Sequence, residues 1–218
     1  MPSPVNFHDR VLLVGKTRSG KSVFARHLMA QMTGARRLLI NVKGSETLGV
    51  EPVYDPAHID WSAPLVDFIP RSMERDVFEE VYRGVFEHAG PRVVWLDEAM
   101  GPTRANYAPP HLDLLQQQGG GLGLGHFYLS QRPQNIAMSL RSEAEHIFMF
   151  GTTFTKRDRD VLGAEMGLSG DQLAERMRQA ADELGDYAFL WYDRNQGELT
   201  DCRPLPAEWA AGGVLVAG

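Results

Sequence analysis

The sequence predicts an α/β protein in which a mostly parallel central sheet carries helices on both faces. Short apolar runs suited to buried strands alternate with segments whose apolar residues recur at helical spacing. A glycine-rich loop joins the first such strand to the first such helix. At 218 residues and 43% hydrophobic residues, we expect one domain over residues 1–218, with 1–8 and about 205–218 as flexible or peripheral tails.

The glycine-rich loop has a phosphate-binding pattern. Residues 10–14 form a short, mostly apolar run, Gly15–Ser22 has the pattern G-x-x-x-x-G-K-S, and a helix is predicted from Ser22 to Met32. Glycines let backbone N–H groups approach phosphate oxygens, and the helix start adds the positive end of its dipole. Lys21 is expected to reach the β- and γ-phosphates of ATP, and the Ser22 hydroxyl to hold Mg²⁺. The predicted ATP-binding residues are Gly15, Lys16, Thr17, Arg18, Ser19, Gly20, Lys21, Ser22 and Val23.

The next segments predict two strands and a helix. Residues 37–42 form a second apolar run, and residues 51–70 are expected to be mostly loop with a short strand near 65–69. Ser72 is predicted to open a helix that Gly90-Pro91 ends. The apolar stripe of this helix is assigned to the core because of its helical spacing. It consists of Val77, Phe78, Val81, Tyr82, Val85 and Phe86.

A buried strand predicted at residues 92–96 ends in the acidic pair Asp97-Glu98. Alone, two carboxylates after a strand favour a solvated turn. Together with the loop at Gly15–Ser22, they predict the second half of a nucleotide site. Asp97 is expected to join the Mg²⁺ shell through water, and Glu98 to polarise the attacking water as a catalytic residue.

The remainder of the chain continues the alternation. A short helix is predicted at 112–118, and the glycine run at 119–125 is predicted to be a flexible connection because it lacks the Lys-Ser/Thr ending of a phosphate loop. Further strands are predicted at 126–129, 146–150 and 187–192. A helix is expected after Thr155, and a capping box at 169–172 opens another. The predicted inner face of that last helix is Leu173, Met177, Ala181 and Leu184.

The strand at 126–129 leads into Ser130-Gln131-Arg132-Pro133. A polar side chain here would either touch the γ-phosphate or belong to a strand-end turn, and the local residues leave both interpretations open.

The order of four segments resembles the FtsK/HerA group of P-loop motor ATPases over about residues 8–165. The segments are 15–22, 39–44, 94–99 and 129–133, of which the Gln-Arg-Pro part of the fourth is the most discriminating. The resemblance implies a RecA-like P-loop NTPase fold of the ASCE class, ATP hydrolysis with Mg²⁺, and a catalytic role for Gln131.

The sequence departs from the group's pattern in three places. Asn41 stands where the group tends to have Asp, and Gly120 stands where an Arg is common. The arginine finger, which completes a neighbouring subunit's site, has no secure match. Arg141 is the first candidate for this role and Arg159 the second.

A single domain leaves no room for the accessory parts of FtsK or HerA, so the chain is expected to be most like the genome-packaging ATPases of tailless viruses with an internal membrane. This subgroup implies double-stranded DNA, a homo-oligomeric ring of five or six subunits and a capsid portal or vertex protein as partners. It implies a location in the host cytoplasm or at the packaging vertex. The net charge of −6 argues against a broadly basic surface, so sparse pore contacts are expected at Lys156, Arg157 and Arg159.

No apolar run approaches the roughly 20 residues of a membrane helix, and residues 1–9 lack a secretion signal pattern, so neither a membrane segment nor secretion is expected. Two alternatives stay open. One is an assembly or secretion ATPase related to zonula occludens toxin, which moves protein. The other is a nonmotor P-loop NTPase or kinase. DNA-stimulated hydrolysis would exclude the first, and a phosphorylated small-molecule product would indicate a kinase.

Overall fold

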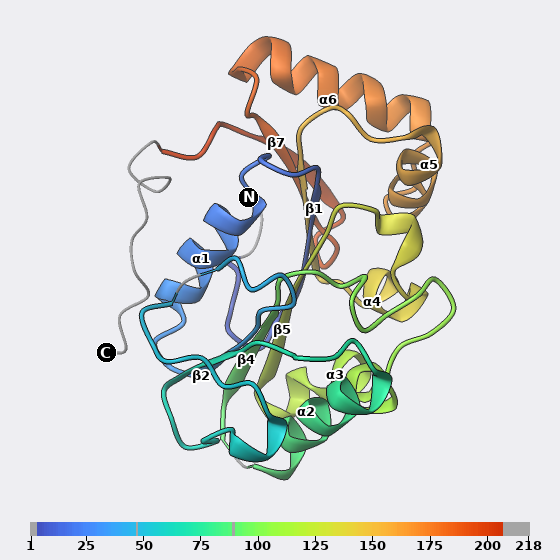
Figure 1. Ribbon diagram of the computed structural model, residues 1–218. Helices are drawn as coiled ribbons and strands as arrows, with labels where there is room; N and C mark the ends of the chain where they lie inside the picture. The colour runs from blue at the N-terminus through green and yellow to red at the C-terminus, as the bar shows by residue number, and fades with distance from the viewer. Residues whose placement is uncertain (1–3, 47, 89, 207–218) are drawn as a thin grey trace.

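One sheet of eight strands, in the order β3-β2-β4-β5-β1-β6-β7-β8, organises the molecule. The computed structural model describes residues 4–46, 48–88 and 90–206, so most of the predicted tails, residues 1–3 and 207–218, lie outside the described residues. Strands β1 to β6 run parallel to one another, whereas β7 and β8 are antiparallel additions at one edge. The mostly parallel α/β fold is therefore confirmed (Figure 1).

The elements follow one another with short connections on most of the chain. The strands are β1 Arg10–Gly15, β2 Arg36–Ile40, β3 Leu65–Phe68, β4 Arg92–Leu96, β5 Leu124–Ser130, β6 His146–Phe150, β7 Phe189–Asp193 and β8 Glu198–Cys202. The α-helices are α1 Lys21–Gln31, α2 Arg75–Glu87, α3 Pro110–Gln118, α4 Met138–Ser142, α5 Lys156–Glu165 and α6 Gly170–Leu184. Short 3₁₀ helices are η1 Pro56–His58, η2 Gly120–Leu122 and η3 Pro133–Asn135.

Alternate residues of the buried strands pack on opposite faces of the sheet. Leu13 of β1 joins Phe24 and Leu28 of α1 in one core cluster. Leu12 of β1 joins the other cluster, to which α2, α3, α4, α5 and α6 contribute. Helices thus lie on both faces, with α1 on one side and the remaining helices on the other (Figure 1). No helix in residues 4–46, 48–88 and 90–206 is both long and apolar enough to cross a membrane.

The strand register brings three loops to one edge of the sheet. Strand β5 lies between β4 and β1, with Tyr128 opposite Leu96 and Ser130 opposite Val14. All three strands are parallel, so their carboxyl ends meet at the same edge. The residues that follow β1, β4 and β5 are those of the glycine loop, the acidic pair and the Gln-Arg-Pro segment.

Several local predictions need correction. Helix α2 begins at Arg75, not at Ser72, because the Ser72 hydroxyl accepts a hydrogen bond from the Glu74 N–H (3.1 Å) and forms a turn ahead of the helix. The capping box of α6 is confirmed, but its buried face contains Ala180 where the sequence favoured Ala181. The glycine run does not remain a loop throughout, since η2 occupies 120–122 and β5 begins at 124. Strand β8 was not predicted, because its alternating residues are only partly buried at the sheet edge.

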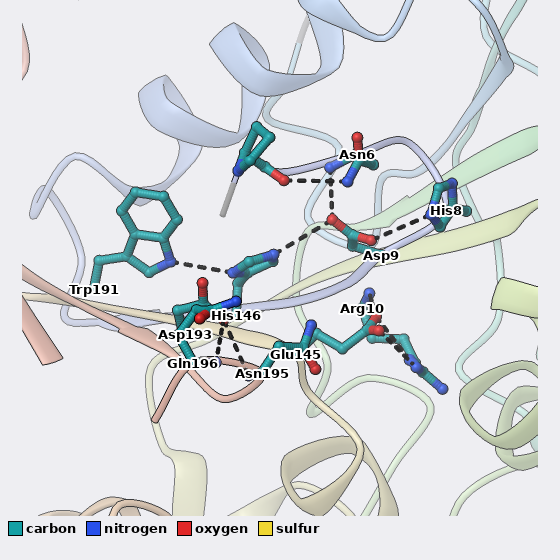
Figure 2. A network of polar contacts seen from close by, with 11 residues as sticks. Asn6, His8, Asp9, Arg10, Glu145, His146, Trp191, Asp193, Asn195 and Gln196 are labelled. Carbon is teal, nitrogen blue, oxygen red and sulfur yellow. Dashed lines mark hydrogen bonds and ion pairs between the residues drawn. The ribbon is translucent and has the colours of Figure 1, made fainter. Parts of the chain in front are cut away.

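A polar network fixes the amino ends of β1 and β6, opposite the edge that carries the loops (Figure 2). The Trp191 indole N–H donates to His146 Nδ1 (3.2 Å), and His146 Nε2 lies 3.3 Å from an Asp9 carboxylate oxygen. Because an indole N–H can only donate, Nδ1 is the acceptor and the ring proton is on Nε2, facing Asp9. Arg10 pairs with Glu145 at 3.0 Å beside this group. The network ties the segment before β1 to β6 and β7.

Candidate functional site

The glycine loop between β1 and α1 has a conformation that its glycines make possible. Gly15 and Gly20 have φ of 153° and 99°, in the region that favours glycine. A Cβ on Gly15 would lie 2.6 Å from the Phe150 carbonyl oxygen, so any larger residue would push β1 and β6 apart. Arg18 at φ 63° is the one non-glycine residue with positive φ in the described part of the chain. The loop is therefore held in a strained, backbone-exposing turn at the start of a helix, as anion binding requires.

Lys21 is a cation with little solvent around it. Its side chain is buried, and its ammonium donates to the Lys16 carbonyl oxygen at 2.7 Å and lies 3.5 Å from the Ser19 hydroxyl. Burial, reinforced by the charge of Lys43, lowers the pKa of Lys21 to about 8. A buried ammonium held by neutral oxygens is under-compensated. It gains most from an anion in the turn of its own loop.

The acidic pair after β4 divides into two environments. Asp97 is 2% exposed, and its carboxylate accepts from the Val42 N–H (2.7 Å) and the Lys43 N–H (3.4 Å). Burial raises the pKa of Asp97 to about 6, although Lys43 opposes this. Glu98 Oε2 pairs with the Lys43 ammonium at 3.0 Å, whereas Oε1 is buried without a hydrogen-bond partner among the described residues. Glu98 therefore keeps one acceptor oxygen available.

Gln131, one residue past the end of β5, joins the acidic pair to the glycine loop. Its amide N–H₂ donates to Glu98 Oε2 at 3.3 Å, and its amide oxygen accepts from the Thr17 hydroxyl at 2.9 Å. These two contacts link the acidic pair to the glycine loop through the Gln131 side chain. A contact between Gln131 and the γ-phosphate stays a prediction.

Comparison with known proteins gives matches at the level of structure. No protein-family model and no curated protein matches the sequence. The genome packaging NTPase B204 from Sulfolobus turreted icosahedral virus 2, solved with ATP-gammaS, superposes with a TM-score of 0.76 at 21% identity, covering 93% of this chain and 100% of that chain. B204 from Sulfolobus turreted icosahedral virus, described as a DNA-packaging ATPase, gives a TM-score of 0.75 at 23% identity with the same coverage. The chain therefore shares the fold of the B204 structures over nearly its whole length.

A third match is partial. The N-terminal domain of zonular occludens toxin from Neisseria meningitidis gives a TM-score of 0.45 at 18% identity, over 65% of this chain and 76% of that chain. A score this low supports no inference about the present protein. The RecA-like P-loop fold expected from the sequence thus rests on the B204 structures and on the sheet itself.

Two cavities flank the glycine loop, and they differ in chemistry. The first has a volume of about 390 Å³ and a largely apolar wall formed by Arg18, Ser19, Gly20, Val23, Phe150, Tyr187, Pro204, Leu205 and Pro206. The second has a volume of about 260 Å³ and a more polar wall formed by Lys16, Thr17, Gln131, Arg132, Thr153, Phe154 and Asp158. Both include residues of the loop itself, so a ligand bound to the loop can extend into either.

A nucleoside triphosphate matches this asymmetry. Its base is flat and largely apolar, and its terminal phosphate is highly charged. The exposed ring of Tyr187 and the ring of Pro204 offer the base stacking surfaces in the first cavity. Lys16 and Arg132 offer cations in the second. The apolar cavity beside Tyr187 thus suits the base, and the polar cavity beside Gln131 suits the terminal phosphate.

The residues proposed for Mg²⁺ fit that ion in the presence of a nucleotide. The described residues contain no group of three or more His, Cys, Asp or Glu side chains able to hold a metal ion by themselves. Mg²⁺ at phosphate sites needs only one or two carboxylates besides phosphate oxygens and water. Ser22 lies in the first turn of α1, and the Asp97 carboxylate is already held by two backbone N–H groups. Asp97 is thus suited to an outer position through water, and a nearby cation would offset its burial.

Sequence reasoning missed parts of this site. Lys43 was noted only within a matching segment, yet its ammonium pairs with Glu98. Tyr187 was assigned to a strand and Leu205 to a tail, yet both line the apolar cavity. No signal in the sequence placed Tyr187 or Leu205 next to Gly20.

The two arginine-finger candidates are engaged within their own chain. The Arg141 side chain is 13% exposed and lies 3.8 Å from Glu165, which also pairs with Arg194 at 3.0 Å. Arg159 donates to the Phe154 carbonyl oxygen at 2.7 Å. To act in a neighbour's site, Arg141 would have to leave Glu165, and Arg159 would have to leave the Phe154 carbonyl oxygen. These contacts therefore do not rank one arginine above the other as the arginine finger.

Proposed function

We propose that this protein is an ATP-hydrolysing motor that translocates double-stranded DNA and packages a viral genome into a preformed capsid. The observation that carries the proposal is a fold shared with a genome packaging NTPase over 93% of this chain, in which the glycine loop, the acidic pair and Gln131 meet at one sheet edge. An ATPase needs these three parts, and the sequence supplies them in separate segments.

Each side chain has a distinct task in hydrolysis. Lys21 and the loop N–H groups bind the β- and γ-phosphates. The unpaired Oε1 of Glu98 accepts a hydrogen bond from the attacking water and then takes its proton as a general base. Mg²⁺, when bound, neutralises charge that develops on the phosphate oxygens. Gln131 spans Thr17 and Glu98, so it can hold the water relative to the γ-phosphate. Gln131→Ala should therefore lower kcat more than it raises KM.

We further propose a homo-oligomeric ring, pentameric or hexameric, in which each ATP lies at a subunit boundary. A neighbouring subunit would supply Arg141 or Arg159 to the phosphates. The test mixes Lys21→Ala subunits with subunits that carry Arg141→Ala or Arg159→Ala. A mixed boundary can combine one intact half from each subunit, so some activity should return. No recovery at any mixing ratio would contradict a shared site.

The proposed DNA contacts lie on α5. Lys156 pairs with Asp160 at 2.7 Å on an exposed face, and Arg157 is exposed beside it. Exposed pairs of this kind hold their partners weakly, so DNA phosphates can compete for Lys156. Sparse contacts suit a motor that must release the duplex after every step. The portal or vertex partner, and a location in the host cytoplasm or at the packaging vertex, belong to the same proposal.

The decisive experiment measures ATPase activity with and without double-stranded DNA across a salt series. DNA should raise the rate at low salt, and the effect should fade as salt rises. Charge reversal of Lys156, Arg157 and Arg159 together should abolish stimulation and leave the basal rate unchanged if none of them is the arginine finger. If DNA never changes the rate of the assembled ring, the DNA-moving proposal fails and a protein-moving ATPase replaces it. A phosphorylated small molecule would instead indicate a kinase.

A further inference from the structure

Arg132 and Asp158 face each other in the polar cavity beside the glycine loop. Arg132 follows Gln131 at the end of β5, and Asp158 belongs to the first turn of α5. Both line the cavity to which Lys16 and Thr17 of the glycine loop contribute. Neither residue has a task in the hydrolysis described above, although both lie where the terminal phosphate is expected.

Asp158 is a buried carboxylate with incomplete compensation. The residue is 1% exposed, and its Oδ2 accepts from the Thr155 hydroxyl at 2.6 Å. The same oxygen lies 3.6 Å from Arg132 Nη1, which is longer than the usual 2.7–2.9 Å of a charge-assisted hydrogen bond. Its Oδ1 is buried and has no hydrogen-bond partner among the described residues. A carboxylate in this position depends on the arginine for its countercharge.

Arg132 combines a fixed backbone with a movable guanidinium. Its N–H donates to the Ser130 hydroxyl at 3.0 Å, and Pro133 follows it at the start of η3. The preceding Gln131 is bonded to Thr17 of the loop. The Arg132 side chain is 47% exposed, and the long contact with Asp158 is the ion pair that the structure gives it. Its guanidinium is therefore anchored near the phosphates but only weakly held.

A simpler interpretation covers part of this arrangement. Thr155 and Asp158 form a reciprocal pair at the start of α5, since the Asp158 N–H also donates to the Thr155 hydroxyl at 3.2 Å. Such a pair caps a helix by itself. A cap explains the Thr155 contact, but it requires neither an arginine nor a place on the wall of the phosphate-side cavity. An asparagine at 158 would keep the cap and remove the charge, so the two interpretations can be separated.

We propose that Arg132 binds the terminal phosphate of the nucleotide within its own chain, and that Asp158 holds this arginine when no terminal phosphate competes. This inference rests on the proposed nucleotide site. A planar guanidinium matches a phosphate with two parallel hydrogen bonds, and the multiply charged phosphate is a stronger partner than a carboxylate 3.6 Å away. A diphosphate does not reach this position, so Arg132 distinguishes ATP from ADP.

The exchange has a consequence for α5. When Arg132 moves to the phosphate, Asp158 loses its countercharge in the first turn of the helix that carries Lys156 and Arg157. The bound nucleotide thereby changes the electrostatics of the helix whose surface we propose to contact DNA. Arg132 also gives the site an arginine of its own, which the sequence did not reveal.

The test compares the dissociation constants of ATPγS and ADP for the wild type, Arg132→Ala, Arg132→Lys, Asp158→Asn and the double variant Arg132→Ala/Asp158→Asn. Arg132→Ala should weaken ATPγS binding by about tenfold or more and leave ADP binding within about twofold. Arg132→Lys should recover part of the loss. Asp158→Asn should strengthen ATPγS binding up to about fivefold, because the half-exposed arginine is released from its long ion pair with the buried carboxylate. This gain should vanish in the double variant.

Arg178→Ala, which removes an exposed arginine from α6, is the matched control and should change neither constant. Circular dichroism verifies that each variant is folded. An unchanged ATPγS-to-ADP ratio in folded Arg132→Ala overturns the inference, as does an Asp158→Asn effect that persists without Arg132. Lys21→Ala tests the proposed site separately, since it should weaken both nucleotides. If Lys21→Ala binds both normally, the nucleotide site itself is wrong.

Discussion

Replacing Glu98 by glutamine changes one atom of the site in a defined way. Glu98 Oε2 accepts from Gln131 and pairs with Lys43, and Oε1 is buried without a partner. The glutamine amide oxygen can take the place of Oε2 and keep both contacts at nearly constant volume. The amide N–H₂ then occupies the Oε1 position. It can donate a hydrogen bond but cannot accept a proton from water.

The expected magnitude follows from that loss. General-base catalysis by a positioned carboxylate contributes about 10²- to 10⁴-fold, which corresponds to about 3 to 5 kcal/mol in the activation free energy. Among the described residues, the hydrogen bonds of Glu98 lead to the glycine loop through Gln131, so nucleotide affinity should change by less than about threefold. The change should therefore be confined to kcat.

Single-turnover hydrolysis of ATP and equilibrium binding of ATPγS measure the two quantities separately. Glu87→Gln is the matched control, because it makes the same substitution on the exposed face of α2, where Glu87 lies 3.6 Å from Arg83. The control should change neither quantity. Hydrolysis by Glu98→Gln within threefold of wild type would refute the assignment of Glu98 as the base. A large loss of ATPγS affinity would show that the Lys43 and Gln131 contacts support binding instead.

Three further substitutions test the fold and the nucleotide orientation. Gly84→Ala places a Cβ 2.2 Å from the Trp61 ring, so the free energy of unfolding should fall by about 1–3 kcal/mol and Tm by several degrees in thermal unfolding. Asp9→Ala removes the acceptor that faces the protonated Nε2 of buried His146, and denaturant unfolding should show a loss of about 1–3 kcal/mol. Tyr187→Ala removes a stacking surface from the apolar cavity, so steady-state kinetics should show KM for ATP raised about fivefold or more with kcat unchanged.

Each of these has a control in the same chain. Gly34→Ala adds a Cβ with nothing within 4 Å, and stability should not fall as it does for Gly84→Ala. His8→Ala removes a side chain that is 46% exposed beside Asp9 and should cost much less than Asp9→Ala. Tyr54→Ala removes another exposed tyrosine, outside both cavities, and should leave KM unchanged. A change in KM equal to that of Tyr187→Ala would place the base elsewhere.

The residues that the sequence predicted best are those whose role is local. The glycine loop needs positive φ at Gly15 and Gly20, and the local turn already requires this. The capping box at Ser169 and the buried stripe of α2 also depend on spacings of three and four residues. Such features lie in adjacent turns of one helix or loop. Their physical basis is therefore present in the order of residues.

The tertiary structure decided which distant residues meet. Gln131 and Thr17 are 114 positions apart, and they bond because β5 lies next to β1. Asp97 accepts from the Val42 N–H because β2 is the other neighbour of β4. Arg132 faces Asp158 because the loop after β6 returns beside the tip of β5. Strand order follows from how all the helices pack on both faces of the sheet, and no local spacing along the chain encodes that packing.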